Sequence, residues 1–209
     1  MEFAAARKVM VDSQVRVNDV TDRGLQAALL AVPRERFCAP ERAFVAYAEV
    51  EPEIAGSRRL MLAREVSKLL MAAEPRAGET ALAIAGPYAA AVLAQLGLVV
   101  TAQESEAAVL DVVAPALADA GVATALQALD QPAAGDWDII ISEGAVGARP
   151  ETWLAALKPG GRAVFVERSG PAGRAVIYVR GQGGLSRREL FEAAPPLLPE
   201  LTPAPTFAL

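Results

Sequence analysis

Histidine is absent from this chain, and cysteine occurs only once, at Cys38. Without an imidazole or a second thiol, Ser-His and Cys-His nucleophilic catalysis, histidine-ligated metals and thiolate zinc clusters are excluded, and we expect no metal site. A single cysteine cannot form an internal disulfide, which favours a reducing, cytoplasmic location. The chemistry open to the chain is therefore that of carboxylates, hydroxyls, backbone amides or a bound cofactor.

Composition and length narrow the class of protein further. The chain is 53% hydrophobic and 22% charged, which is typical of a globular protein rather than a disordered one. A formal net charge of -5 argues against a nucleic-acid partner, because such a surface needs clustered basic residues. The length of 209 residues predicts one domain, with a helical N-terminal extension over 1–78 and an α/β core over 79–209.

Residues 1–78 are predicted to form helices joined by loops. Asp19 or Thr21 can cap a helix that Pro33 ends. The segment 51–59 combines proline, glycine and charge and is predicted to be a loop. A further helix is expected at about 63–73.

From residue 80 onward, predicted strands alternate with helices. The strands are expected at 80–85, 98–103, 122–127, 137–144 and 162–167, with helices beginning near residues 89, 105 and 151. Ser105 is the expected cap of its helix, Pro115 should kink or divide that helix, and Lys158 should lie at the negative end of the last helix. Two glycine-linked segments, 174–181 and 185–193, predict an antiparallel hairpin. This order predicts a mostly parallel sheet with helices on both sides, closed by an antiparallel C-terminal hairpin.

The uncharged stretch from Thr80 to Gln103 is long enough to span a bilayer. Its alanine content, the Gly86-Pro87 break and the β-branched residues at its end favour a buried strand, a helix and a second strand instead. We therefore expect no membrane segment.

A ligand of an open parallel sheet binds beyond the carboxyl ends of the strands. After the first strand of the core, the loop contains one glycine, Gly86, and then Pro87, which has no N–H to donate. After the fourth strand, Glu143 stands where a ligand could be touched, although an exposed loop carboxylate is equally ordinary. The alternative for the first loop is a tight turn into a packed, alanine-rich helix.

Four motifs occur in an order that resembles the protein-L-isoaspartate O-methyltransferase family. They are MVDSQVRVNDVTD at 10–22, VPRERF at 32–37, WDIIISEGA at 137–145 and LKPGGRAVFV at 157–166. The resemblance implies a Rossmann-like, three-layer methyltransferase fold, S-adenosylmethionine as cofactor, and isoaspartyl residues of damaged proteins as substrate. Methyl transfer from a sulfonium to a carboxylate needs alignment and desolvation more than a general base, so the lack of histidine does not oppose it.

The resemblance also assigns cofactor positions to this chain. It places Gly86 and Tyr88 in the turn after the first strand, and Asp130 near the adenine. Gln103 falls at the carboxylate position for the ribose, and Glu104 follows it but should point to the opposite face of the sheet. Tyr88 has a packing role as its alternative, and Asp130 has a solvated loop position as its alternative.

Other family positions have changed type. Ala83 stands at the acidic position of the first strand, and Ala85 stands at the first glycine of the turn. In the substrate loop, Met61 falls at the family serine and Ala63 at the proline, whereas Ser57 is out of register, so no catalytic side chain is assigned. Arg58 and Arg59 either meet a substrate carboxylate or face water.

The cost of these changes can be estimated. Losing one carboxylate and weakening another removes about 2–5 kcal/mol from cofactor binding, or roughly two to three decades of affinity. Two hypotheses follow: a repair methyltransferase with an altered cofactor loop, and a non-catalytic relative that acts as a binding or regulatory partner. Open space beside Gly86 favours the first, and filled space favours the second.

Overall fold

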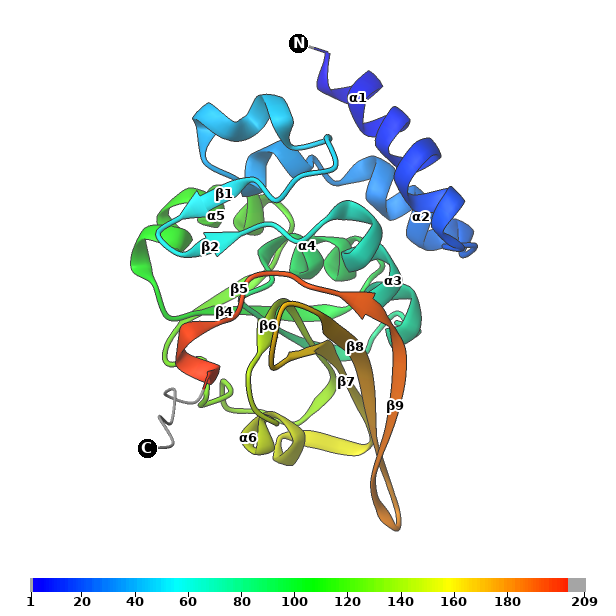
Figure 1. Cartoon of the computed structure of the whole chain (residues 1–209), viewed down its shortest axis with the longest axis vertical. Helices are drawn as coiled ribbons and strands as arrows, with labels where there is room; N and C mark the ends of the chain where they lie inside the picture. Colours follow the sequence, from blue (N-terminus) through cyan, green and yellow to red (C-terminus); the bar gives the residue numbers. More distant parts are fainter. Residues whose placement is uncertain (1, 203–209) are drawn as a thin grey trace.

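A seven-stranded sheet forms the centre of the molecule in a computed structural model that describes residues 2–202 (Figure 1). The strand order is β5-β4-β3-β6-β7-β8-β9, with parallel pairing from β5 to β7 and antiparallel pairing of β8 and β9. The strands are β3 (Thr80–Ile84), β4 (Val99–Glu104), β5 (Ala123–Leu126), β6 (Trp137–Val146), β7 (Leu157–Arg168), β8 (Gly173–Gly181) and β9 (Gly184–Ala193). The predicted parallel sheet and C-terminal hairpin are both confirmed.

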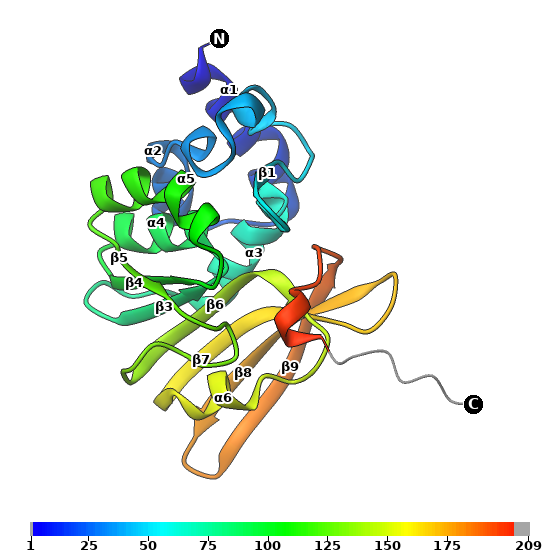
Figure 2. The ribbon, with the colours of Figure 1, turned by 90° about the vertical axis from the view of Figure 1, so that its left-hand side faces the viewer.

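Helices cover the two faces of the sheet unequally (Figure 2). One face carries α3 (Ala63–Ala73), α4 (Pro87–Gln95) and α5 (Ala107–Asp119), and the other carries the short α6 (Glu151–Ala155). The apolar run in β6 serves both layers: Ile139 and Ile141 join the α3–α4–α5 core, whereas Ile140 joins the core under α6. This alternation is what a strand buried on both faces requires.

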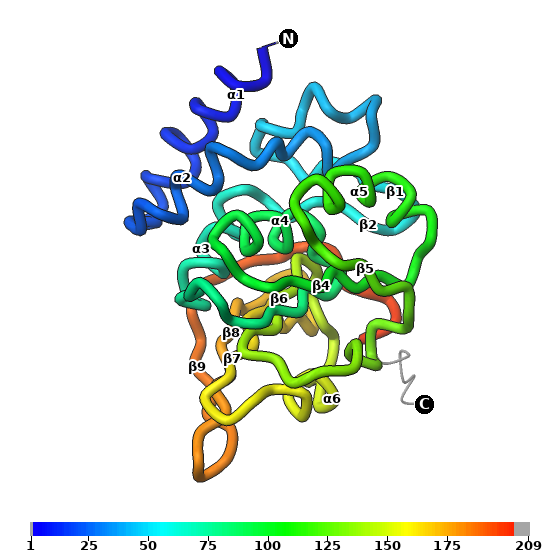
Figure 3. The backbone as a smooth tube through the Cα atoms, turned by 180° about the vertical axis from the view of Figure 1, so that it is seen from behind, coloured from blue at the N-terminus to red at the C-terminus, as the bar shows by residue number. Residues whose placement is uncertain are grey.

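The N-terminal segment packs on the outside of the α3–α4–α5 layer, away from the β8–β9 hairpin tip (Figure 3). It contains α1 (Phe3–Met10), a π-helical turn (Val11–Val15), short 3₁₀ turns (Arg16–Asn18, Arg34–Phe37, Pro40–Val45) and α2 (Arg23–Ala31). The cap prediction for α2 was wrong: Asp22 accepts the Leu25 N–H at 2.6 Å, whereas Asp19 has a left-handed backbone. The domain boundaries stay a prediction.

Several local predictions require correction. The segment 51–59 contains a small hairpin, β1 (Glu53–Ala55) with β2 (Arg58–Arg59), rather than only a loop. Ser105 does not cap α5, because the N-cap residue is Glu106, and Pro115 lies inside α5 without dividing it. Lys158 does not serve the end of α6: it belongs to β7, and its Nζ donates to Asp138 Oδ2 at 2.7 Å.

The uncharged stretch from Thr80 to Gln103 divides into β3, α4 and β4, as predicted. Within residues 2–202, no helix has both the length and the apolar character needed to cross a bilayer.

Candidate functional site

The candidate site lies where β3 and β6 end side by side. The chain passes from β3 outward to β4 and β5 and then returns to place β6 on the opposite side of β3. In open α/β sheets, such a change of direction opens a crevice at the carboxyl ends of the two strands, and ligands bind in that crevice. Gly86 follows β3, and Glu143 lies in β6 with Ser142 paired to Ile84.

Glu143 fills this position with its own carboxylate. The residue is 1% exposed, and its Oε1 accepts the Ala89 N–H of α4 at 2.9 Å. A Cβ built on Gly86 would lie 3.5 Å from the Glu143 Cγ, so the side chain packs directly against the turn. Burial raises the pKa of Glu143, while the bond from the Ala89 amide and the charge of Arg34 partly oppose that rise. The exposed loop carboxylate offered as an alternative is therefore wrong.

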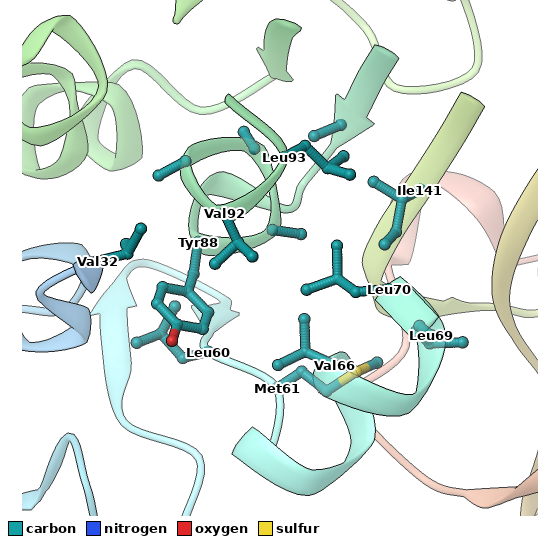
Figure 4. Close-up of a cluster of buried hydrophobic side chains, with 14 of the residues drawn as sticks. Val32, Leu60, Met61, Val66, Leu69, Leu70, Tyr88, Val92, Leu93 and Ile141 are labelled. Atoms are coloured by element: carbon teal, nitrogen blue, oxygen red, sulfur yellow. The ribbon is translucent and has the colours of Figure 1, made fainter. Parts of the chain in front are cut away.

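Tyr88 is a packing residue in this structure. Its ring is fully buried and lies edge-on to Phe37, with a centroid distance of 5.8 Å. Figure 4 shows the ring directed from α4 toward Leu60 in the apolar cluster. Burial raises the pKa of Tyr88 to about 12, and no described residue bonds to its hydroxyl.

Arg34, from the VPRERF motif, was missed by sequence reasoning. It is 1% exposed and donates to the carbonyl oxygens of Ala46 and Met61, and its guanidinium lies 4.8 Å from the Tyr88 ring centroid. Its Nη1, the Tyr88 hydroxyl and the Glu143 Oε2 are buried without a partner among residues 2–202. The available signal was its position in the VPRERF motif, directly after Pro33.

The side-chain amide of Gln103 is hydrogen-bonded to other residues of the protein. Its Nε2 donates to the carbonyl oxygens of Ala128 at 2.8 Å and Gln131 at 3.0 Å, and its Oε1 accepts the Ala133 N–H at 2.8 Å. These bonds hold the loop after β5. Both polar atoms of the side chain are therefore engaged by this loop.

The Glu104 carboxylate is also bonded within the protein, to Arg58. It points to the opposite side of β4 from Gln103, as expected. Arg58 donates through Nε to both of its carboxylate oxygens at 3.0 Å. Arg58 also donates to Ser57 and Ser105 at 3.0 Å and to Glu200 at 2.7 Å. Arg58 is 4% exposed, so it faces neither water nor a substrate, whereas Arg59 is exposed.

The remaining sequence-predicted positions do not converge on the site. Asp130 is exposed, and its side chain makes no hydrogen bond within the described part of the chain. Met61 is fully buried, and Ser57 donates to Glu106 at 2.8 Å.

The cavity between the turn after β3 and the end of β4 is very small. A cavity of about 10 Å³ is lined by Gly86, Pro87, Gln103, Glu104 and neighbouring apolar residues. That volume admits about one water molecule, whereas a pocket for a ligand of cofactor size has roughly 300–1,000 Å³. The residues present do not fit S-adenosylmethionine, because Gln103 and Glu104 are bonded within the protein and Glu143 packs against the Gly86 turn.

Solved structures with the same architecture define the class. A protein-L-isoaspartate O-methyltransferase aligns over 95% of this chain and 66% of its own, with a TM-score of 0.76 and 18% identity. A Plasmodium falciparum structure, described as a putative enzyme of that name in complex with S-adenosyl-L-homocysteine, aligns over 93% of this chain and 98% of its own, with a TM-score of 0.80 and 12% identity. The chain therefore has the Rossmann-like methyltransferase fold.

Sequence relatives give the family. A protein-L-isoaspartate O-methyltransferase of Methylorubrum extorquens strain PA1 is 31% identical over 91% of this chain and 84% of its own length. A protein of the same name from Methylorubrum populi is 31% identical over 86% of this chain and 87% of its own length. No family model matches the sequence. The chain belongs to the protein-L-isoaspartate O-methyltransferase family.

Proposed function

We propose that this chain is a non-catalytic member of its family, a single methyltransferase-like domain that acts by binding a protein partner. The observation that carries the proposal is the filled crevice beside Gly86, where the Glu143 carboxylate lies on the first turn of α4. Proteins containing isoaspartyl residues are the partner class that the names of the relatives suggest.

The charge arrangement supports the same proposal. A sulfonium cofactor with ribose hydroxyls needs free carboxylates and accessible backbone amides. Here the carboxylate of Glu104 is paired with Arg58, and the Ala89 amide is taken by Glu143. Opening the site on the Glu104 side would break its buried ion pair with Arg58, and leaving either charge buried without its partner costs about 3–5 kcal/mol.

The proposal is tested by calorimetric titration of the protein with S-adenosylmethionine and S-adenosylhomocysteine. A second arm measures transfer of labelled methyl to an isoaspartyl peptide, with the Methylorubrum extorquens relative as a positive control. We expect no binding in the micromolar range and no label above the no-enzyme blank. Micromolar binding, or label above the blank, would overturn the proposal.

Retained methyl transfer is the second candidate, favoured by the 31% identity over most of the chain. It requires the crevice to open when cofactor binds. Asp130→Ala separates the two candidates, because the family resemblance places this residue near the adenine. If the protein binds cofactor in the family manner, this substitution should weaken the affinity at least several-fold.

A further inference from the structure

A second cavity, distinct from the crevice beside Gly86, opens on the α6 side of the sheet. Its volume is about 490 Å³, and it shares no lining residue with the crevice. Its walls are the segment 146–149 after β6 and the loop between β7 and β8, which projects from the sheet in Figure 2. The charged and aromatic lining residues are Arg149, Glu167, Arg168, Arg174, Tyr178 and Arg187.

The lining is strongly basic in an acidic protein. It holds four arginines and one glutamate, whereas the chain has a formal net charge of -5. Glu189 pairs with Arg187 at 3.2 Å, and two more carboxylates pair with these arginines from outside the cavity: Glu151 with Arg149 at 3.0 Å and Glu192 with Arg174 at 2.7 Å. The side chains of these two glutamates are 69% and 70% exposed. Such surface pairs contribute little stability, so a bound anion can replace them.

Arg168 is oriented without being neutralised. Its Nε donates to the Gly170 carbonyl oxygen at 2.8 Å, and its Nη1 donates to those of Ala194 at 3.0 Å and Pro195 at 2.8 Å. Among residues 2–202 it forms no ion pair. Carbonyl oxygens fix the direction of the guanidinium without neutralising it, and its charge also acts on the nearby carboxylate of Glu51, where it opposes the rise in pKa that burial causes.

The one acidic group of the lining is already used. Glu167 accepts the Tyr178 hydroxyl through Oε1 at 2.6 Å, and Arg187 donates to its Oε2 at 2.7 Å and 3.1 Å. Tyr178 stacks on Phe165 at a centroid distance of 5.6 Å, and the guanidinium of Arg149 lies 5.3 Å from the Tyr178 ring centroid. The Tyr178 ring thus positions the Arg149 guanidinium, and the Glu167 carboxylate is paired with Arg187.

We propose that this cavity binds a small, multiply charged oxyanion, either a phosphate ester or a polycarboxylate. Guanidinium groups recognise both through paired, charge-assisted hydrogen bonds. The volume lies in the range of small-molecule sites. The inference does not depend on whether the chain methylates a substrate, since the two cavities have no residue in common.

Calorimetric titration with pyrophosphate and with citrate, at low ionic strength, tests the proposal. We expect at least one of them to bind, and the tighter one identifies the ligand class. Arg149→Gln should weaken binding about tenfold or more, as expected for one charge-assisted hydrogen bond. Arg188→Gln is the matched control, because this exposed neighbour of Arg187 lines a separate cavity with Arg76 and Arg162, and it should leave the affinity unchanged.

Two measurements guard against a merely structural effect. Glu167→Gln removes the negative charge of the lining and should tighten binding severalfold, whereas a variant that only loosens the fold would weaken it. In the wild-type protein, pyrophosphate or citrate should protect Arg149 and Arg168 from phenylglyoxal, read by mass spectrometry, but should not protect Arg188. The proposal is overturned if neither anion binds above an equal concentration of chloride, or if Arg188→Gln weakens binding as much as Arg149→Gln.

Discussion

Arg58 donates through Nε to both carboxylate oxygens of Glu104 at 3.0 Å, although the two residues are 46 positions apart. Both side chains are 4% exposed. The pair joins the β1–β2 hairpin to the end of β4, and Glu200 adds the C-terminal turn to the same guanidinium at 2.7 Å. Glu104, which follows the ribose position that the family resemblance assigns to Gln103, therefore holds the fold together.

Removing one partner of this ion pair should be costly. We expect Arg58→Met to lower the free energy of unfolding by about 3–5 kcal/mol, because it leaves the Glu104 carboxylate buried without its counterion. The double substitution Arg58→Met with Glu104→Leu should lose clearly less than the single one. Urea unfolding of the four proteins of the cycle measures the coupling, and strictly additive losses would contradict a direct pair.

Glu143 should make stability depend on pH in an unusual direction. Burial raises its pKa in the folded state above the ordinary value of 4.5, so the folded protein binds this proton more tightly than the unfolded chain does. Its contribution is fully present below the ordinary pKa and is lost as pH rises through the raised value. Glu143→Gln should therefore gain stability relative to wild type as pH rises from the ordinary pKa of 4.5 toward neutral.

The measurement is urea unfolding of both proteins at several pH values across that range. Glu192→Gln, at an exposed position, is measured alongside as the control. A constant difference between Glu143→Gln and wild type would show that this carboxyl keeps an ordinary pKa.

The buried hydroxyl of Tyr88 should be dispensable. It has no hydrogen-bond partner in the described structure, and an unsatisfied buried polar group costs about 1–3 kcal/mol. Tyr88→Phe should thus leave thermal stability unchanged or raise it by about 1 kcal/mol. Tyr178→Phe is the matched control, because its hydroxyl donates to Glu167 at 2.6 Å, and it should destabilise by a similar amount. A clear loss from Tyr88→Phe would mean that the hydroxyl has a partner.

Ala85 carries backbone strain at the end of β3. Its φ is 48°, in the left-handed region that costs a non-glycine residue about 1–2 kcal/mol. Ala85→Gly should raise the free energy of unfolding by about 1 kcal/mol, net of the added flexibility of the unfolded chain. Ala83→Gly, in the extended interior of the same strand, should instead lower it by about 0.5–1 kcal/mol. Equal effects at the two positions would argue against strain at Ala85.

Most of the scaffold was predictable from local patterns. The helix at 63–73 and the parallel strands followed from hydrophobic periodicity and turn residues, because these record which faces an element must bury. Errors concentrated at element ends, as at Ser105 and Lys158. At both positions the polar side chain bonds to a residue distant in the sequence and not to its own helix. Ser105 donates to Glu200, and Lys158 donates to Asp138.

The sequence by itself determined the layers of the fold and the family, since both depend on residue type and order. Only the tertiary structure decided that Glu143 lies against Gly86 and that Arg58 neutralises Glu104. Both contacts join residues more than forty positions apart. Their formation depends on which strands become neighbours and on which charges burial then forces to pair, and no local pattern contains that information.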